Sequence, residues 1–307
     1  MLLRRSGWRP VSAPTGHAGA DRSLLRRRFG RAAAGYGEAA VVQREVASRL
    51  LDGLERLPAE PSVIVDAGAG PGETAGRLRR RFGKAQVLAL DLALPMLRLA
   101  RRQGGFWRPL PAVCADIGAL PLVDASVDLL YSNLALHWLD DIDAVLAGFQ
   151  RVLRPDGLLL LACFGPQTLI ELRQAWAAAD DRPHVHEFPD MAALGDALMA
   201  RGFRDPVLDR DLFPLSHDNL DGLLADLRRQ GMANARRDRH RGLAGKVAWQ
   251  RMRAFHHEHF QADDGQCLST LEVIYVHALA PAIGQPRRSG SGEVATIPVS
   301  AIRRRRQ

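Results

Sequence analysis

The chain has 307 residues, 47% of them apolar, and a net charge of +8 that comes almost entirely from arginine. Three cysteines, Cys114, Cys163 and Cys267, show no CxxC spacing, which argues against a disulfide-stabilised secreted protein and against a zinc site. No apolar run reaches the ~18 residues of a membrane span. We therefore expect a cytoplasmic protein that is not bound to a membrane, with material for one large domain or two smaller ones.

Arginine, glycine, serine and proline are concentrated at the two ends. Residues 1–20 contain arginines and no acid, and residues 281–307 include four consecutive arginines at 303–306. This composition predicts disordered basic tails on either side of a domain at 21–280. A mitochondrial presequence would share the amino-terminal composition, but this segment has two prolines and no clear amphipathic pattern. We expect no nucleic-acid binding, because no interleaved aromatic residues accompany the arginines.

Helical and strand-like patterns alternate between the tails. Val42, Val46, Leu50 and Leu54 recur every four residues and predict a helix before the first strand. Seven strand-like runs follow, at 62–67, 86–92, 111–116, 127–133, 157–164, 205–213 and 270–279. We predict an α/β protein with a doubly wound, mostly parallel seven-stranded Rossmann-like sheet. Two polar, arginine-rich segments, 165–200 and 214–265, are predicted to be helical insertions that cap the edge of the sheet where ligands bind.

The first predicted strand ends in DAGAGPG, residues 66–72. In an open parallel sheet this turn faces the ligand crevice, and Gly68, Gly70 and Gly72 let the backbone approach a ligand closely. The spacing is GxGxG and not the GxGxxG of dinucleotide binders. Asp66 would repel a diphosphate but could hold a cation. The loop therefore favours a cationic, phosphate-free nucleoside, S-adenosylmethionine.

Polar side chains also end the next three predicted strands. Asp91 is placed to accept the hydroxyl groups of a ribose. Asp116 is placed to accept the adenine amino group, with Ile117 packing on the ring. Asn133 and Leu134 should border the methyl donor. Each acid could instead cap a following helix, but agreement among successive strand ends favours the cofactor interpretation.

These motifs resemble the class I S-adenosylmethionine-dependent methyltransferases over about residues 60–165. The flanking segments, 27–51, 164–176, 184–209, 223–235 and 270–279, resemble the malonyl-acyl-carrier-protein O-methyltransferases of biotin synthesis. The resemblance implies an enzyme that esterifies the free carboxylate of a malonyl thioester. Its partner would be an acyl-carrier protein, or coenzyme A in its place, and we expect a monomer.

The resemblance also implies which residues form the site. Further cofactor-binding residues would be Arg31, Gln43, Leu92 and Met96. Because a malonyl carboxylate is already ionised at neutral pH, methyl transfer needs orientation and removal of water more than a general base. We predict that Arg173 grips the carboxylate and that Tyr36 lies near the methyl group. A third catalytic candidate is His137, although a histidine beside a tryptophan equally suits packing.

Other functions stay open from the sequence alone. A related mitochondrial group with similar flanks hydroxylates an arginine of a respiratory-complex subunit or assists assembly of complex I. Other methyltransferases act on small carboxylic acids, and a degenerate site would make a non-catalytic binding module. Arginines of the predicted cap could steer an acidic carrier protein, namely Arg228, Arg229, Arg236, Arg237, Arg239 and Arg241.

Overall fold

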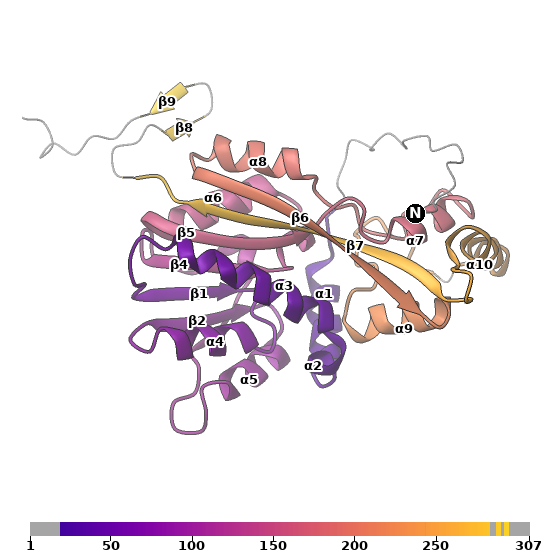
Figure 1. The fold of residues 1–307 in the computed structure, drawn as a ribbon, viewed down its shortest axis with the longest axis horizontal. Helices are drawn as coiled ribbons and strands as arrows, with labels where there is room; N and C mark the ends of the chain where they lie inside the picture. Colours follow the sequence, from indigo (N-terminus) through magenta and orange to yellow (C-terminus); the bar gives the residue numbers. More distant parts are fainter. Residues whose placement is uncertain (1–18, 243, 283–286, 290–291, 295–307) are drawn as a thin grey trace, which may run out of the picture.

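A seven-stranded sheet forms the centre of the protein in a computed structural model, which describes residues 19–242, 244–282, 287–289 and 292–294 (Figure 1). Its strand order is β3-β2-β1-β4-β5-β7-β6. The strands are β1 (Val63–Ala67), β2 (Gln86–Asp91), β3 (Ala112–Cys114), β4 (Val127–Asn133), β5 (Leu153–Phe164), β6 (Arg204–His217) and β7 (Cys267–Leu279). The first five pair in parallel, and β7 runs antiparallel between β5 and β6. The predicted mostly parallel seven-stranded sheet is confirmed.

Helices cover both faces of the sheet. The helices are α1 (Arg22–Ala32), α2 (Tyr36–Ala39), α3 (Val41–Asp52), α4 (Glu73–Arg81), α5 (Leu94–Arg102), α6 (Ile142–Val152), α7 (Ile170–Ala177), α8 (Met191–Ala200), α9 (Leu220–Arg229) and α10 (Lys246–Phe260). Short 3-10 turns are η1 (Gly53–Arg56), η2 (Ile117–Ala119) and η3 (Leu136–Trp138). The core side chains of α3, α4 and α5 pack on one face of the sheet, and those of α6 and α8 pack on the other.

The apolar run of β5 shows why this chain makes a doubly covered sheet. Leu158 and Leu160 contribute to the cluster under α3, whereas Leu159 and Leu161 contribute to the cluster under α6. All four are fully buried, so both faces of the strand need apolar residues and the run is nearly continuous. β6 is the edge strand, and its burial alternates between half-buried and exposed positions. Pro206 and Pro214 fit this edge position, because an edge strand has N–H positions that need no partner in the sheet.

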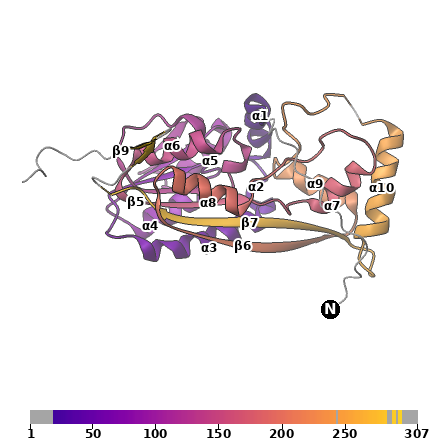
Figure 2. The same cartoon turned by 90° about the horizontal axis from the view of Figure 1, so that it is seen from above.

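The strands β6 and β7 are longer than the sequence predicted and extend beyond the rest of the sheet. Their pairing continues to His217 opposite Cys267. Figures 1 and 2 show that α7, α9 and α10 gather at this far end. Trp176 of α7 and Trp249 of α10 lie with their ring centroids 5.7 Å apart. We call α7, α9, α10 and the connecting residues 178–190 and 230–242 the lid.

The segment 165–200, predicted to be cap throughout, divides between two locations. Its first helix, α7, belongs to the lid. Its second helix, α8, packs on the sheet, where Leu194 and Leu198 are buried in the same cluster as Phe149 of α6. Asp190 begins α8 by accepting a hydrogen bond from the backbone N–H of Ala193 at 2.7 Å.

Most residues of the two predicted basic tails lie outside the described residues. Of the first tail, Gly19 and Ala20 are described, and Ala20 forms a β-bridge with Arg236 of the lid. Of the second, β8 (Arg287–Ser289) and β9 (Gly292–Val294) pair with each other. Within the described ranges, no helix is both long and apolar enough to cross a membrane.

Candidate functional site

A cavity of about 240 Å³ opens where β1 and β4 end, beside α2 and α3. We call it the glycine-loop cavity, because Gly68 and Gly70 form part of its wall. Tyr36, Gln43, Asp66 and Asn133 contribute polar side chains to the same cavity, at positions the sequence had singled out. Its wall also contains residues that sequence reasoning missed, among them Arg44, Glu73, Thr74, Arg77 and Tyr131. The nearest signal for Glu73 and Thr74 was their place directly after the glycines.

The three glycines of the loop have positive φ angles of 83°, 53° and 76°. A Cβ atom on Gly72 would lie 2.7 Å from the Cα of Ala100, and one on Gly68 would lie 2.5 Å from the Cβ of Ala135. A Cβ on Gly70 would meet nothing within 4 Å. Gly68 and Gly72 are therefore required for packing of the turn, whereas Gly70 keeps space free at the cavity.

Asp91, at the end of β2, is held against the glycine loop. Its Oδ2 accepts a hydrogen bond from the N–H of Gly70 at 2.9 Å, and its Oδ1 accepts one from Ala93 at 2.7 Å. Burial raises the pKa of this carboxyl, while the backbone donors, including Leu92, oppose the shift. The two bonds fix the orientation of the carboxylate, and each oxygen retains a lone pair for a ligand.

Asp66 is 2% exposed, and its Oδ2 has no hydrogen-bond partner among the described residues. Burial raises its pKa to about 7, and the charge of Asp91 adds to this shift. Gln43 Oε1 and Asn133 Oδ1 are likewise buried and unpartnered in the described part of the chain. Buried acceptors normally have partners, so three such oxygens around one cavity fit a ligand rich in donors and positive charge. The amino and sulfonium groups of S-adenosylmethionine meet this requirement.

Tyr36 and Gln43 come from one face of the segment that spans α2 and the start of α3. Tyr36, Ala40 and Gln43 are four and three residues apart and all line the cavity. Burial, Asp91 and Glu73 raise the pKa of the Tyr36 phenol, so that it stays protonated at neutral pH. The Asn133 side chain donates to the backbone carbonyl of Gln43 at 3.0 Å and thereby ties α3 to the end of β4.

Asp116 does not line the glycine-loop cavity. Its Oδ1 accepts from the N–H of Gly118 at 2.8 Å, which caps η2, and from Arg22 at 3.1 Å. This is the helix-capping arrangement that the sequence had left as an alternative. Ile117 is 8% exposed and packs in the core cluster on the α6 side.

The remaining predicted cofactor residues separate in the structure. Met96 is 1% exposed and packs with Ala32 and Ala33 between α5 and the end of α1. Leu92 packs against a small cluster around Leu25 and Trp138. Arg31 lines a different cavity, beside α9. None of the three lines the glycine-loop cavity. The direction of these side chains depends on how the helices pack, which the local sequence does not encode.

Leu134 continues from β4 with a positive φ of 51° and is 9% exposed. Its N–H donates to the carbonyl of Ala162 at 2.8 Å. A non-glycine residue in this conformation costs of order 1–2 kcal/mol. The strained residue directly follows Asn133, and such strain is found preferentially at functional sites.

His137 is buried among aromatic rings and lies outside the cavity wall. Its ring centroid is 4.6 Å from that of Phe164, 5.0 Å from Trp138 and 5.6 Å from Phe188. Its Nδ1 accepts from the N–H of Phe164 at 3.4 Å. Burial lowers the pKa of His137 well below its usual value, so the ring is neutral. The ring contacts fit the packing interpretation of this histidine, while its Nε2 has no hydrogen-bond partner among the described residues.

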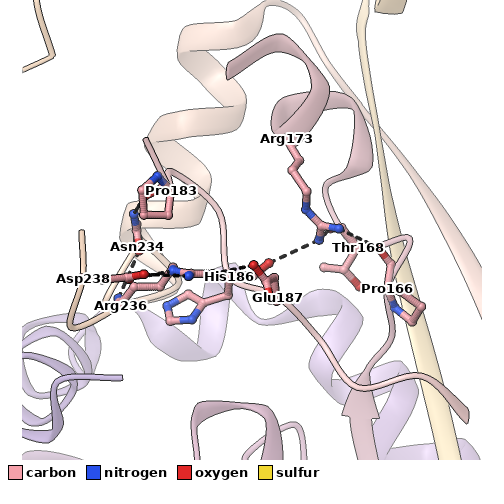
Figure 3. A network of polar contacts seen from close by, with 9 residues as sticks. All are labelled: Pro166, Thr168, Arg173, Pro183, His186, Glu187, Asn234, Arg236 and Asp238. Carbon is pink, nitrogen blue, oxygen red and sulfur yellow. Dashed lines mark hydrogen bonds and ion pairs between the residues drawn. The ribbon is translucent and has the colours of Figure 1, made fainter. Parts of the chain in front are cut away.

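Arg173 is partly buried and points from α7 toward the turn after β5 and the segment around His186 (Figure 3). Its guanidinium donates to the carbonyl of Pro166 at 3.1 Å and to the carbonyls of Thr168 and His186 at 3.2 Å each. Burial lowers its pKa, and Glu187 opposes that shift. Arg173 does not line the glycine-loop cavity; it joins the turn after β5 to the lid segment around His186.

A network of paired charges continues from Arg173 into the lid (Figure 3). Arg236 is 6% exposed and pairs with Glu187 at 3.1 Å and with Asp238 through two contacts of 2.8 Å. The ring of His186 accepts from the N–H of Ala235 at 3.0 Å, and burial lowers its pKa to about 4. Arg236 was expected to steer a partner from the surface. That expectation is wrong, because its side chain is buried and paired.

Comparisons with known proteins agree with this geometry. A family model described as a methyltransferase domain matches residues 65–161, which extend from β1 into β5. A protein of Bacillus halodurans C-125 described as a methyltransferase has the same fold, with a TM-score of 0.54 and 18% identity over 76% of this chain and 100% of that one. The YcgJ protein of Bacillus subtilis has a TM-score of 0.54 and 16% identity over 75% and 97%.

Two curated proteins are much more similar in sequence, and both are named malonyl-[acyl-carrier protein] O-methyltransferase. The protein of Xylella fastidiosa strain M23 is 46% identical over 94% of this chain and 97% of its own length. The protein of Laribacter hongkongensis strain HLHK9 is 47% identical over 87% and 92%.

The sheet order, the glycine loop and the matching domain thus define a class I methyltransferase. Similarity to the curated relatives extends far beyond that domain, through α1–α3 and the lid. The chain belongs to the malonyl-[acyl-carrier protein] O-methyltransferase family. Membership in this family disfavours the alternative of an arginine hydroxylase or an assembly factor.

Proposed function

We propose that the protein transfers a methyl group from S-adenosylmethionine to the free carboxylate of a malonyl group held as a thioester on an acyl-carrier protein. The observation that carries the proposal is the 46% identity over 94% of the chain to a relative of that name. That alignment is far longer than the methyltransferase domain, so it includes lid segments that a shared cofactor alone would not require. We further propose that the protein acts as a monomer in the cytoplasm, without nucleic acid or membrane.

The glycine-loop cavity supplies the groups that would hold the cofactor. Asp66, Gln43 and Asn133 would accept from its amino and cationic end, and Asp91 would accept from ribose hydroxyls beside Gly70. S-adenosylmethionine, when bound, supplies a sulfonium methyl group, which a carboxylate oxygen takes up as the carbon–sulfur bond breaks, with no proton to remove. The protein's part is therefore to orient the oxygen and exclude water.

The lid and α2 would orient the carboxylate. Tyr36, protonated and at the cavity wall, can donate a hydrogen bond to it. Arg173 stays our candidate for the carboxylate anchor. In the structure its guanidinium holds backbone carbonyls, which a carboxylate could replace as the stronger acceptor. No base is required, in agreement with a neutral, packed His137.

The decisive experiment incubates the purified protein with malonyl-acyl-carrier protein and S-adenosylmethionine labelled in the methyl group. We expect a base-labile methyl ester on the carrier and release of S-adenosylhomocysteine. Acetyl-carrier protein, which lacks the free carboxylate, is the matched control. Methylation of free malonate in preference to the carrier-bound group would instead support a methyltransferase of small carboxylic acids.

A further inference from the structure

A second and larger cavity, of about 560 Å³, lies between the start of α3, the end of β6 and helix α9. In Figure 1, α2 and α9 lie close together below the extended ends of β6 and β7, and they are in contact. The functional assignments above leave this cavity without a role. Its volume is within the ~300–1,000 Å³ of sites that take small molecules.

The segment from α2 into α3 contributes side chains to both cavities. On the segment from α2 into α3, Tyr36 and Gln43 line the glycine-loop cavity, while Ala39 and Val42 line the second one. Gln43 Nε2 donates to Oε1 of Gln230, a residue that lines the second cavity, at 2.7 Å. A molecule in the second cavity would thus have one end beside the wall of the methyl-donor site.

The second cavity combines an apolar wall with cations. Its apolar lining includes Val42, Leu215, Leu223, Leu227 and Leu271. Its charged lining consists of arginines at 31, 228 and 229, opposed by two acids at 38 and 226. The lining as a whole therefore favours an elongated ligand that is partly apolar and carries a negative charge.

The charges of this lining are not balanced within the cavity. Asp226 is already engaged by Arg229 at 3.0 Å and by the side chain of Gln230 at 2.8 Å. Arg31 and Arg228 are exposed, and in the described part of the chain no carboxylate lies within the 4.0 Å of an ion pair from either of them. These two arginines can therefore take an external anion.

We infer that the second cavity receives the phosphopantetheine arm that presents the malonyl thioester. This inference rests on the proposed function, because it takes a carrier-bound thioester as the substrate. The arm is elongated, has amides and methyl groups along its length, and ends in a phosphate. Arg228 and Arg31 bind that phosphate, the leucines contact the arm, and the malonyl end reaches the Gln43–Gln230 boundary. Arg31, which sequence reasoning assigned to the cofactor, thereby acts on the substrate.

A pair of small substrates tests the phosphate contact directly. Malonyl-phosphopantetheine and malonyl-pantetheine differ only in the phosphate. We expect KM to be about tenfold lower for the phosphorylated compound, because contacts from two exposed arginines, each worth up to about 1 kcal/mol, together give about that factor. Arg228→Glu should bring the two KM values together, and Arg31→Glu should do the same.

Arg98→Glu makes the same charge change on the exposed face of α5 and should preserve the tenfold difference. Leu215→Trp, which fills the cavity without changing its charge, should raise KM for both compounds and for malonyl-acyl-carrier protein. A melting curve for each variant establishes that it is folded. Calorimetry with S-adenosylmethionine on Arg31→Glu should show unchanged affinity, since that residue lies away from the glycine-loop cavity.

The inference would be overturned, while the proposed function stands, by equal KM values for the two compounds with the unaltered protein or by a preserved tenfold difference in Arg228→Glu and Arg31→Glu. The inference would also be overturned if the two arginine variants raised KM for malonyl-acyl-carrier protein but not for malonyl-phosphopantetheine. The arginines would then contact the carrier surface and not the arm. Absence of methyl ester on every malonyl thioester would reject the proposed function itself.

Discussion

The glycine-loop cavity and the lid network differ in how far their buried polar groups have hydrogen-bond partners. Around the cavity, Asp66, Gln43 and Asn133 each have a buried oxygen without a partner among the described residues. In the lid, Arg236 pairs with two acids, and Arg173 donates to three carbonyls, although its Nε has no partner among the described residues. Both regions contain charged groups far from water, so burial alone does not distinguish a binding site from a structural one. The gathering of three unpartnered acceptors around one cavity does.

Substituting Asp66→Asn should have the largest effect and tests the cavity side of this comparison. The variant keeps the shape but loses the negative charge that a cationic donor requires. We expect S-adenosylmethionine to bind about 100-fold more weakly, as for loss of a buried charge-assisted contact. Isothermal calorimetry measures this directly. An affinity within a few-fold of the unaltered protein would mean that the unpartnered Asp66 oxygen does not mark the donor site.

The raised pKa of Asp66 predicts how stability and donor affinity change with pH, which tests the same interpretation of this carboxyl. Its pKa is raised to about 7 from 3.8, so between these values the folded state binds more protons than the unfolded state. The free energy of unfolding should therefore fall as pH rises through this window, by at most about 1.4 kcal/mol per pH unit from this group. Donor affinity should change in the opposite direction and weaken as pH falls below about 7.

Denaturant titrations of the unaltered protein and Asp66→Asn across this pH range isolate the contribution of the one carboxyl. Asp66→Asn should lack this contribution to the pH dependence. In the absence of S-adenosylmethionine, the variant should also be more stable than the unaltered protein at alkaline pH. Identical pH profiles for the two proteins would contradict the raised pKa.

The glycine loop offers a matched pair with the next largest effect. Gly72→Ala places a methyl group 2.7 Å from the Ala100 Cα at a φ of 76°, so we expect about 2–3 kcal/mol of destabilisation. Gly70→Ala meets nothing within 4 Å, so it should cost only the ~1 kcal/mol of its left-handed conformation while narrowing the cavity. Urea denaturation compares the two. Equal stabilities would show that the turn adjusts freely at Gly72.

Removing one member of the lid network should cost about 2 kcal/mol. Arg236→Ala removes the buried guanidinium that pairs with Glu187 and Asp238, and we reduce the full penalty for a broken buried pair because Asp238 is partly exposed. Arg253→Ala, which removes an exposed pair with Asp221, should cost less than about 0.5 kcal/mol and serves as the control. Donor affinity should stay unchanged in both variants. A large loss of donor binding in Arg236→Ala would erase the distinction between the two regions.

The smallest expected effect is that of His137→Phe. The ring is neutral and surrounded by Phe164, Trp138 and Phe188, so phenylalanine should fill its place at a cost of about 1 kcal/mol, mainly from the lost 3.4 Å hydrogen bond of the Phe164 N–H. Turnover on malonyl-acyl-carrier protein should stay within about threefold, and its pH profile should keep its shape, because no general base is lost. A fall of a hundredfold in kcat would return His137 to the catalytic group.

The sheet could be predicted because its signals are local. The apolar runs in the sequence correspond to β1 to β7 in the structure. The three glycines predicted to form a sharp turn have positive φ angles. The lengths of β6 and β7 were underestimated, since their ends are stabilised by pairing with each other across about 50 residues of sequence. Tyr36, Gln43, Asp66 and Asn133 were named individually from the sequence and meet at one cavity.

By itself the sequence determined the order of strands and helices, the glycine turn and the acids at the strand ends, because propensity, turn chemistry and parallel-sheet geometry act over a few residues. Only the tertiary structure decided that Met96 is packing, that Arg31 faces a second cavity and that Arg173 and Arg236 are bound within the lid. The direction of a helical side chain relative to a distant helix depends on how whole elements pack. An arginine that pairs across the fold is indistinguishable, in the sequence, from one that faces water.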